Sequence, residues 1–247
     1  MSSRRARPST LLRAVRLSLA AAAGAALLPT ASVAQTSMLP TLVTSHIAEG
    51  VVHNRLVPLG GAAQPHTGAW TTERRFTDDG GTPAVLQVMT IGAPGHLSVD
   101  SLLFDRATLL PIWERFHGAA TRIVSFAGRH VTGRITRPDS ADRAIDVTTA
   151  GPAYSGTIDD VIVQSVPLTP GYTVVISCTG GEAVEIDTIR VRRRERVPTR
   201  AGPGEAWAVD LVYPTGSETL WLDPATRAIV RHIYTRADHS QLEMISN

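Results

Sequence analysis

Paired carboxylates can act together in general acid–base catalysis, and this sequence places two side by side at Asp159 and Asp160. The residues around them, from Thr157 to Pro167, predict a short helix in which both acids occupy the first turn. Neighbouring side chains on a helix point about 100° apart, so these carboxylates do not converge on one substrate atom. We therefore interpret both as acids that oppose the positive end of the helix dipole, without a catalytic role.

Histidines and the single cysteine are the other groups with reactive chemistry. His117, His130 and His232 are far apart in the sequence and would serve a hydrolase only if the fold brought one beside an acid and a hydroxyl group. Cys178 ends an apolar strand pattern, which favours a buried thiol over a nucleophile. The sequence has no His-Glu-x-x-His, Cys-x-x-Cys, Gly-x-Ser-x-Gly or phosphate-binding loop motif. We therefore predict a protein that is not an enzyme, with no cofactor and no metal site.

A run of arginines near residue 190 is the most concentrated charge in the sequence. Alternate residues of a strand share one face, so Arg190, Arg192, Arg194 and Arg196 would form a row in an extended segment. Such a row can bind lipid phosphates or another anionic polymer through bidentate contacts. The alternative is a solvated face whose charges pair with nearby acids such as Glu185.

The first 34 residues predict a secretory signal peptide. Five arginines precede an apolar run of 12 residues, Leu17 to Leu28, which is too short to span a bilayer, and Ser32-Val33-Ala34 is a small-residue cleavage site. No Leu-x-x-Cys motif precedes that site, so we expect an exported, soluble periplasmic or secreted protein that is not a lipoprotein and has no later transmembrane segment. Cleavage removes 5 of 24 basic residues and leaves 19 against 22 acidic residues, a net charge of −3, which disfavours a nucleic-acid partner.

Most of the remaining chain predicts β-structure. Residues 35–69 hold His46, His53 and His66 at spacings that match no metal-ligand signature, and we expect an N-terminal arm that is poorly ordered or forms one strand. Alternating apolar and polar residues, separated by turn residues, continue to residue 236 and predict about eleven strands. Residues 237–247 are predicted to form a loose tail.

One strand–turn–strand pattern occurs twice, around Asp105 and around Asp223. Both turns have the sequence Asp-x-Ala-Thr, and an aspartate that opens a turn accepts a backbone N–H two residues further on. Turn geometry explains both acids, so we predict two β-hairpins of the same kind rather than a reactive role for either carboxylate.

The helix predicted over 157–167 interrupts the strands. Thr157 is expected to cap the backbone N–H of Asp160, and Pro167 ends the segment. A helix this short is not stable alone, so its apolar side must be buried against the sheet. The apolar stripe consists of Ile158, Val161, Ile162 and Val166.

A sheet of about eleven antiparallel strands curls strongly because each strand is twisted. We therefore predict a mainly β fold in which residues 70–236 form a single domain. Its sheet is expected to be a strongly curved half-barrel, covered in part by one short helix at 157–167.

Several turn and core motifs occur in a characteristic order. They are Val99-Asp100-Ser101-Leu102 with Thr108-Leu109-Leu110-Pro111, Phe126-Ala127-Gly128 with Val131-Thr132-Gly133, Ile158-Asp159-Asp160 with Pro167-Leu168 and Pro170-Gly171-Tyr172, and Trp221-Leu222-Asp223 with Thr226 and Val230-Arg231. In this order they resemble the secreted bacterial family known as domain of unknown function 3108, over about residues 70 to 235. The Leu-x-Leu-Asp-x-x-Thr hairpin is also similar to that of LolA/LolB-type lipoprotein carriers, which are half-barrels that hold acyl chains in the concave face.

These resemblances imply a binding function. We expect an amphipathic ligand, a lipid or glycolipid, in the concave face of the sheet, although a register slip of one residue would invert each face. The expected lining residues are Val99, Trp113, Val161, Ile162, Trp207, Val209, Leu211 and Trp221. The alternative is a structural or interaction module of the cell envelope that binds a protein or polysaccharide partner.

Overall fold

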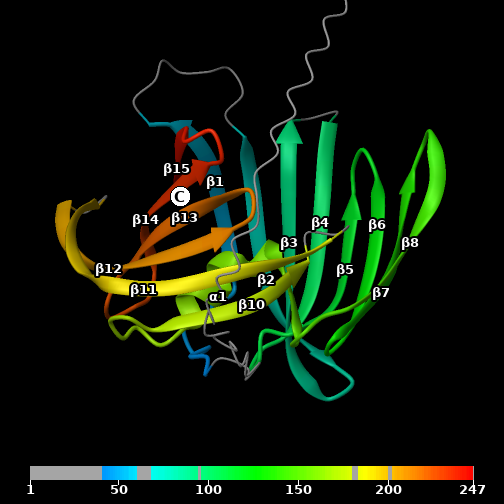
Figure 1. Ribbon diagram of the computed structural model, residues 1–247, viewed down its shortest axis with the longest axis horizontal. Coiled ribbons are helices and arrows are strands. Elements are labelled where there is room, and N and C mark those ends of the chain that lie inside the picture. Colours follow the sequence, from blue (N-terminus) through cyan, green and yellow to red (C-terminus); the bar gives the residue numbers. More distant parts are fainter. Residues whose placement is uncertain (1–40, 60–67, 94–95, 180–182, 200–201, 247) are drawn as a thin grey trace, which may run out of the picture. The chain divides into compact units, whose positions relative to one another are not determined.

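A computed structural model describes residues 41–59, 68–93, 96–179, 183–199 and 202–246. The predicted signal peptide over 1–34 and His66 lie outside the described residues. Fifteen strands of the described part form one sheet, and all neighbouring strands are antiparallel except the pair β9–β10 (Figure 1). No helix of the described part combines the length and apolar character needed to cross a membrane.

The strands and helices follow one another along the chain with short connections. The first eight strands are β1 Gly50–Pro58, β2 Ala69–Asp79, β3 Thr82–Ala93, β4 His96–Asp105, β5 Pro111–His117, β6 Thr121–Ala127, β7 His130–Arg137 and β8 Ser140–Thr148. The other strands are β9 Ala153–Ser155, β10 Thr173–Thr179, β11 Val184–Thr199, β12 Gly202–Tyr213, β13 Gly216–Leu222, β14 Ile229–Arg236 and β15 Gln241–Ser246. Between β9 and β10, a 3-10 helix η1, Gly156–Ile158, continues directly into helix α1, Asp159–Ser165.

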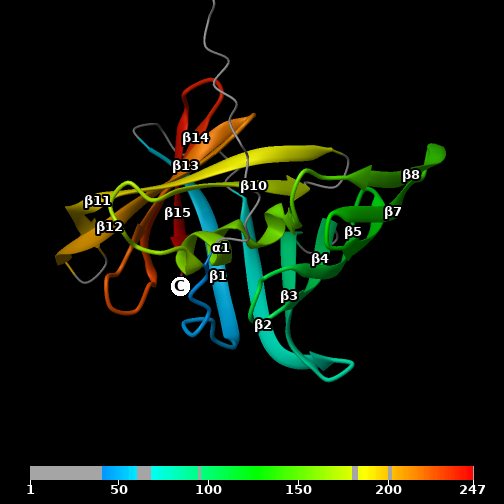
Figure 2. The same ribbon diagram turned by 60° about the horizontal axis from the view of Figure 1, so that its bottom comes forward.

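The first and last strands meet in the middle of the sheet. From β1 the chain meanders outward to the edge strand β8, and β10 to β15 meander back until β15 pairs with β1. Ser246 Oγ in β15 donates to Asn54 Oδ1 in β1 at 2.6 Å. The segment β9–η1–α1 therefore connects the two outer parts of the sheet across its concave face (Figures 1 and 2).

The predicted fold class, a mainly β protein with a strongly curved antiparallel sheet and one short helix, is confirmed. The sheet has 15 strands in the described residues, more than the predicted eleven. The N-terminal arm contributes one strand, β1, and the tail predicted to be loose instead forms β15 over Gln241–Ser246. The two paired strands β1 and β15 lie near opposite ends of the sequence. No short turn connects them, so no turn motif in the sequence predicts their pairing.

The two Asp-x-Ala-Thr turns have the same geometry, as predicted. In each turn, Oδ1 of the aspartate accepts the backbone N–H groups two and three residues further on, at 2.9 and 2.7 Å. The strand after each turn has one extra residue, Ile112 in β5 and Val230 in β14, and the residue four positions after the aspartate has a positive φ, 58° at Leu109 and 61° at Arg227. Leu109 is fully buried in the core, whereas the side chain of Arg227 reaches helix α1.

Helix α1 packs on the concave face of the sheet, and its apolar stripe is buried as predicted. Each residue of the stripe is at most 1% exposed: Ile158, Val161, Ile162 and Val166. They form one core with side chains of β10 to β13, among them Ile189, Val209 and Leu211. Burial of each large apolar side chain contributes about 1.5–3 kcal/mol, which stabilises a helix that would not form alone.

The predicted capping box is wrong. Ser155 Oγ accepts the backbone N–H of Thr157 at 3.1 Å and caps η1, while α1 begins after Ile158 without a side-chain cap. Thr157 Oγ1 instead donates to Asp100 Oδ2 in β4 at 3.3 Å. The sequence signal fails because the segment first forms a 3-10 turn, which moves the cap two residues towards the N-terminus.

The other end of α1 is held by the second repeated turn. The guanidinium of Arg227 donates to the backbone carbonyls of Gln164 and Val166 at 2.7 and 2.8 Å. The last carbonyls of a helix have no intrahelical partner, so this contact satisfies two of them. Side chains from the sheet thus fix both ends of the helical segment, and the position of α1 follows from the strands.

Candidate functional site

A cavity of about 310 Å³ lies on the concave face between α1 and the sheet. Strands β1, β2, β3, β13, β14 and β15 form its floor, and η1 and α1 form the opposite side. Its apolar lining is Val52, Trp70, Met89, Ala228, Ile229 and Met244. Its polar lining is Asn54, Thr72, Arg74, Gln87, Thr157, Asp159, Asp160, Gln164, Glu218, His232, Tyr234 and Ser246. Both methionines of the described part lie here, and methionine adapts to ligands of varied shape.

A hydrogen-bonded link joins helix and sheet on one side of the cavity. Arg74 in β2 donates to Asp160 Oδ2 at 2.8 Å and to Gln87 Oε1 at 2.6 Å. Gln87 Nε2 in turn donates to the backbone carbonyl of Thr157 at 2.8 Å. Asp159 does not take part, so the two adjacent aspartates point apart, as predicted from helix geometry.

A buried acid–base pair forms another part of the wall. His232 Nε2 lies 2.6 Å from Glu218 Oε2, and the two residues are 3% and 5% exposed. The ring of Tyr234 stacks on that of His232, and the hydroxyl groups of Tyr234 and Tyr213 hydrogen-bond to Glu218. Burial and the nearby Glu218 charge raise the pKa of both tyrosines, which keeps them protonated as donors.

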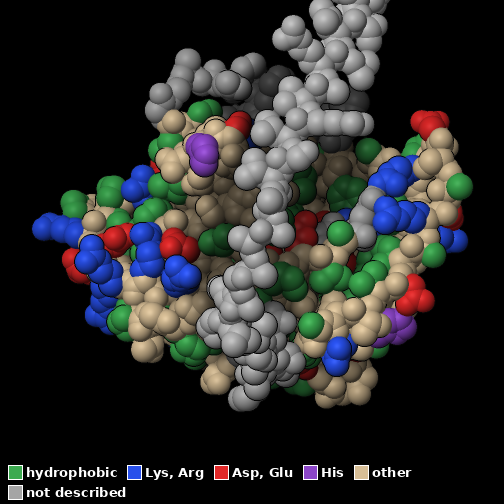
Figure 3. All heavy atoms as spheres, in the orientation of Figure 1, with side chains coloured by type: hydrophobic (Ala, Val, Ile, Leu, Met, Phe, Trp, Pro, Cys, Tyr) green, Lys and Arg blue, Asp and Glu red, His purple; other side chains and the backbone are tan. Residues whose placement is uncertain are grey.

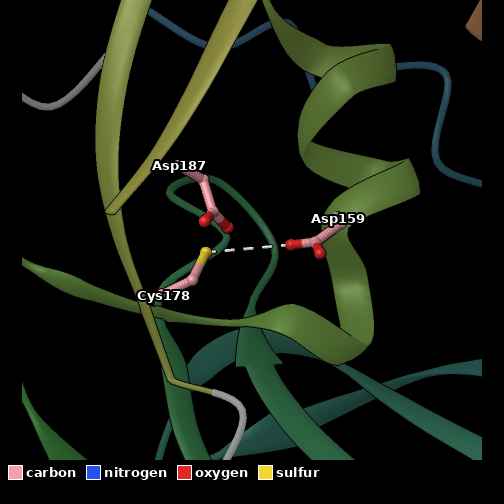
Figure 4. A group of neighbouring side chains, drawn as sticks. All are labelled: Asp159, Cys178 and Asp187. Atoms are coloured by element: carbon pink, nitrogen blue, oxygen red, sulfur yellow. Dashed lines mark hydrogen bonds between the residues drawn. The ribbon is translucent and has the colours of Figure 1, made fainter. Parts of the chain in front are cut away.

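Behind the cavity, two carboxylates and the thiol converge from three different elements. One donor atom from each of Asp159 in α1, Cys178 in β10 and Asp187 in β11 lies within 4.8 Å of the other two (Figure 4). Cys178 Sγ is 3.8 Å from Asp159 Oδ1, and Asp187 Oδ1 has no hydrogen-bond partner in the described part. Burial, followed by the charges of Asp159 and Asp187, raises the pKa of the Cys178 thiol well above its usual value. Cys178 is buried, as predicted.

A second buried network anchors the start of the helical segment. Arg122 in β6 pairs with Glu114 and lies 3.6 Å from Asp100 Oδ2. Ser155 Oγ donates to Glu114 Oε2 at 2.6 Å. Burial, and then the charge of Glu114, raise the pKa of Asp100 to about 7, against the opposing effects of Arg122 and the Thr157 hydrogen bond. This network holds η1 on the sheet.

A second hollow, of about 320 Å³, adjoins the cavity. The two share five lining residues: Val52, Thr72, Arg74, Gln164 and Ala228. His46 lines the second hollow, and neither of its ring nitrogens has a partner in the described residues. Burial and the charge of Arg227 lower the pKa of His46, so its ring is neutral at neutral pH. The concave face therefore offers a ligand more room than one cavity alone.

The residues predicted to line a ligand site do not line the cavity. Val161, Ile162, Trp207, Val209 and Leu211 are packed in the core beside α1, although Val161 also borders the second hollow. Strands with a strong alternation of apolar and polar residues thus form the packed part of the concave face. The cavity is lined instead by both polar and apolar residues.

Three other residues of that prediction lie on the opposite, convex face. Trp221 packs there with Ala206 and Ala208, whereas its neighbours Leu220 and Leu222 face the core. Val99 and Trp113 alternate with Asp100 and Glu114, whose side chains point to η1 on the concave side. Successive residues of a strand point to opposite faces of the sheet. Val99, Trp113 and Trp221 were expected on the concave face, and that expectation is wrong, because their sequence neighbours occupy it.

The predicted arginine row is divided by a β-bulge between Val191 and Arg194. Arg190 and Arg192 lie on the convex side, where Arg192 Nε is 3.3 Å from Asp210 Oδ2. Arg194 and Arg196 lie on the concave side, where Arg194 stacks over the Trp207 ring at 5.0 Å. Two residues of a bulged strand oppose one residue of its partner, which reverses the alternation. Figure 3 shows basic side chains mixed with acids over β11 and β12, at the left; anion binding stays a prediction.

The three histidines of the hydrolase alternative are not brought together. His117 contacts Thr121 at 3.3 Å, and His130 pairs with Asp146 at 2.7 Å on the exposed surface. His232 lines the cavity beside the acid Glu218, which also accepts hydrogen bonds from the hydroxyl groups of Tyr213 and Tyr234. One histidine therefore meets the stated condition, and the hydrolase alternative stays a prediction. Of the early histidines, His53 is exposed and His46 is half-buried.

Sequence reasoning missed Glu218, Asp187 and the tyrosines around Glu218 as site residues. One signal could have found the acids: each is a charged residue in the buried phase of its strand. Glu218 is in phase with Leu220 and Leu222, and Asp187 is in phase with Ile189 and Val191. A charged residue in such a position needs a buried partner, so it marks a polar site inside the fold.

The fold and the site together define a class of protein: an open, strongly curved β-sheet with a cavity between its concave face and a covering helix. The chain belongs to the family described as protein of unknown function DUF3108, whose family model matches residues 65–240, and the predicted resemblance is confirmed. A solved structure that is similar is the beta-barrel-like protein of domain of unknown function DUF1849 from Brucella abortus, with 12% identity and a TM-score of 0.46 over 81% of this chain and 98% of that chain. No curated protein has a significant similarity to this chain. The likeness to LolA/LolB-type carriers is not confirmed and stays a prediction.

Proposed function

We propose that this protein is an exported binding protein that holds a small amphipathic ligand in the cavity beneath α1. The observation that supports this function is the cavity itself, with about 310 Å³ of space and an adjoining hollow of about 320 Å³. Ligand pockets usually measure about 300–1,000 Å³ and combine apolar walls with a few placed polar groups. The concave face meets this description without rearrangement of the core.

The size of the cavity narrows the ligand class. One cavity holds a small molecule or the end of one chain, and the two hollows together hold a single extended chain rather than a whole lipid. Trp70, Met89 and Met244 offer apolar contact, and Asn54, Glu218 and His232 offer hydrogen bonds on the other side. The mixed lining therefore favours an amphipathic ligand, and the lipid or glycolipid expected from the sequence stays a prediction.

The charges of the wall favour a ligand whose polar end donates hydrogen bonds. Asp159, Asp160 and Glu218 line the cavity, and the arginine that lines it, Arg74, is already paired with Asp160. An anionic head group would approach carboxylates, whereas an amine or a hydroxyl group can donate to them. We propose binding rather than catalysis, because the mixed apolar and polar lining of the cavity is typical of a ligand pocket.

A titration with two simple amphiphiles tests this function. Octylamine and octyl sulfate have the same chain and opposite charge, and binding is measured by calorimetry below their micelle concentrations. We expect octylamine to bind and octyl sulfate to bind at least about tenfold more weakly. Met244→Trp, which fills the cavity, should remove binding, whereas Val175→Trp on an exposed position of β10 should not. The proposal would be refuted if octylamine and octyl sulfate bound equally well, or if Met244→Trp bound octylamine as well as Val175→Trp does.

A specific observation also favours the alternative, an interaction module of the cell envelope. Val175, Ile186 and Val212 lie on one face of β10 to β12, and each is close to half exposed at 47%, 47% and 48%. A protein or polysaccharide partner could cover these side chains. Replacing all three with threonine should leave octylamine binding intact, and it should abolish capture of a specific envelope partner if this function holds.

A further inference from the structure

The cluster behind the cavity offers the donor set of a metal site. It holds a sulfur atom from Cys178 and carboxylate oxygens from Asp159 and Asp187, each on a different element (Figure 4). Thiolate and carboxylate are both zinc ligands, and three protein ligands with an open fourth position form a common zinc arrangement. No metal site was predicted from the sequence. Asp159, Cys178 and Asp187 lie on different elements and match no metal-ligand spacing, so only the fold brings them together.

The distances are compatible with one ion. In a tetrahedral zinc site the metal–ligand distances are about 2.0–2.3 Å, so that donor atoms lie roughly 3.5 Å apart. Here Sγ of Cys178 is 3.8 Å from Oδ1 of Asp159, and no pair of donor atoms is more than 4.8 Å apart. The donor atoms are thus at most about 1.3 Å further apart than in a formed zinc site.

Two buried polar atoms at this place, Asp187 Oδ1 and the Tyr154 hydroxyl oxygen, lack a hydrogen-bond partner in the described residues. Asp187 is 3% exposed, its Oδ1 accepts no hydrogen bond, and Figure 4 shows its carboxylate directed at Cys178 and Asp159. Tyr154 in β9 is 1% exposed, its hydroxyl group also has no partner, and it lies opposite Cys178 in the strand register. Buried polar groups are almost always satisfied, so unpartnered atoms at one place are where an ion or a water molecule would bind.

In the described part of the chain, no basic side chain forms an ion pair with Asp159 or Asp187. Arg74 pairs with Asp160 on the other side of α1, and His232 pairs with Glu218. Within the described residues, neither Asp159 nor Asp187 has an ion pair, and Glu218 adds a further negative charge near both. Buried carboxylates are normally paired with a cation or bound to a metal ion.

We propose that Asp159, Cys178 and Asp187 bind one Zn²⁺ ion, with a water molecule in the fourth position on the side of the cavity. Asp159 lines the cavity and keeps partial exposure, so the ion reaches the site through it. The thiol binds as thiolate, and its proton leaves to solvent. The ion would tie α1 to β10 and β11, and this role does not depend on the amphipathic ligand proposed above.

Cobalt substitution tests the site, because Co²⁺ replaces Zn²⁺ and gives a sulfur-to-cobalt charge-transfer band when a thiolate binds it. The chain has a single cysteine, so that band can arise only at Cys178. The full chain, reduced and freed of metal with a chelator, is titrated with Co²⁺ and then with Zn²⁺. We expect one equivalent of Co²⁺, a charge-transfer band, and loss of that band when Zn²⁺ displaces the cobalt.

Three variants make the test specific. Cys178→Ser should remove the band, and Asp187→Asn should weaken metal binding by about tenfold or more while the metal-free protein still unfolds cooperatively. Asp146→Asn, which removes an exposed carboxylate beside His130, is the control and should bind as the wild type does. Absence of the band in the wild type, or a band unchanged by Asp187→Asn, overturns the proposal. Octylamine binding by the metal-free protein is measured in parallel, so a failure of one proposal is distinguishable from a failure of the other.

Discussion

His232 Nε2 lies 2.6 Å from Glu218 Oε2, and both side chains are buried where strands β13 and β14 border the cavity. The same contact occurs on the surface, where His130 Nε2 lies 2.7 Å from Asp146 Oδ1 with both side chains at least half exposed. The molecule therefore contains two histidine–carboxylate pairs of nearly equal length that differ in burial. Burial decides what each pair contributes.

Loss of the buried histidine should destabilise the protein. His232→Ala removes one donor from Glu218 and leaves a void beside Tyr234, so we expect the free energy of unfolding to fall by about 1–3 kcal/mol. His130→Ala, its exposed counterpart, should change it by less than about 0.5 kcal/mol because water replaces the lost contact. Chemical denaturation of both variants measures the difference, and equal effects would show that the buried pair has no special role.

The arginine of the second repeated turn should be needed for α1. Arg227 donates to two carbonyls at the end of the helix, and Arg227→Leu removes both bonds. Leu109 occupies the equivalent position in the first turn with a similar positive φ. A leucine at position 227 can therefore adopt the backbone conformation of the turn. We expect a loss of about 1–3 kcal/mol and faster amide exchange in α1. Arg236→Leu at an exposed position is the control, and unchanged exchange in α1 would contradict the assignment.

Stability should depend on pH through Asp100. Burial and Glu114 raise the pKa of this carboxyl group from 3.8 to about 7 in the folded protein. Between these values the folded state holds a proton that the unfolded chain has lost, so Asp100 favours folding most at low pH, and this contribution declines as the pH rises towards 7. Glu114, Arg122 and Thr157 face the same group and set the balance.

Asp100→Asn tests that dependence, because asparagine resembles the protonated carboxyl group at every pH. We expect the variant and the wild type to have similar free energies of unfolding near the low end of this range. Above pH 7 the variant should be relatively more stable, since it avoids a buried charge beside Glu114. Denaturation curves at several pH values measure the difference between the two proteins. A difference that is constant with pH would exclude the proposed proton.

Local patterns predicted local structure well. The aspartates at 105 and 223 specify their turns through bonds that span three residues, and the apolar stripe of α1 follows from helix period alone. The pairing of β1 with β15 could not be predicted in this way, because Asn54 and Ser246 are 192 residues apart. The bulge at Val191 also has no clear local signal, and it reversed the expected direction of the arginines beyond it.

The candidate site could be predicted only in outline. The concave face was expected to bind a ligand, but apolar residues such as Val209 and Leu211 were chosen, and these form the packed core. The cavity instead lies where Arg74, Glu218 and His232 interrupt the apolar pattern. Arg74 in β2 is distant in sequence from Glu218 and His232, which lie on the neighbouring strands β13 and β14, and only the order of strands in the sheet brings Arg74 near them.

Native mass spectrometry of the protein, purified from a bacterial envelope fraction without detergent, tests the central claim most directly. We predict an adduct of one small molecule per chain that is released by organic solvent and proves to be amphipathic with a hydrogen-bond-donating end. Met244→Trp purified in the same way should have no adduct, whereas Val175→Trp should retain it. A wild-type protein with the mass of the bare chain, or an adduct retained in Met244→Trp, would contradict a ligand in this cavity.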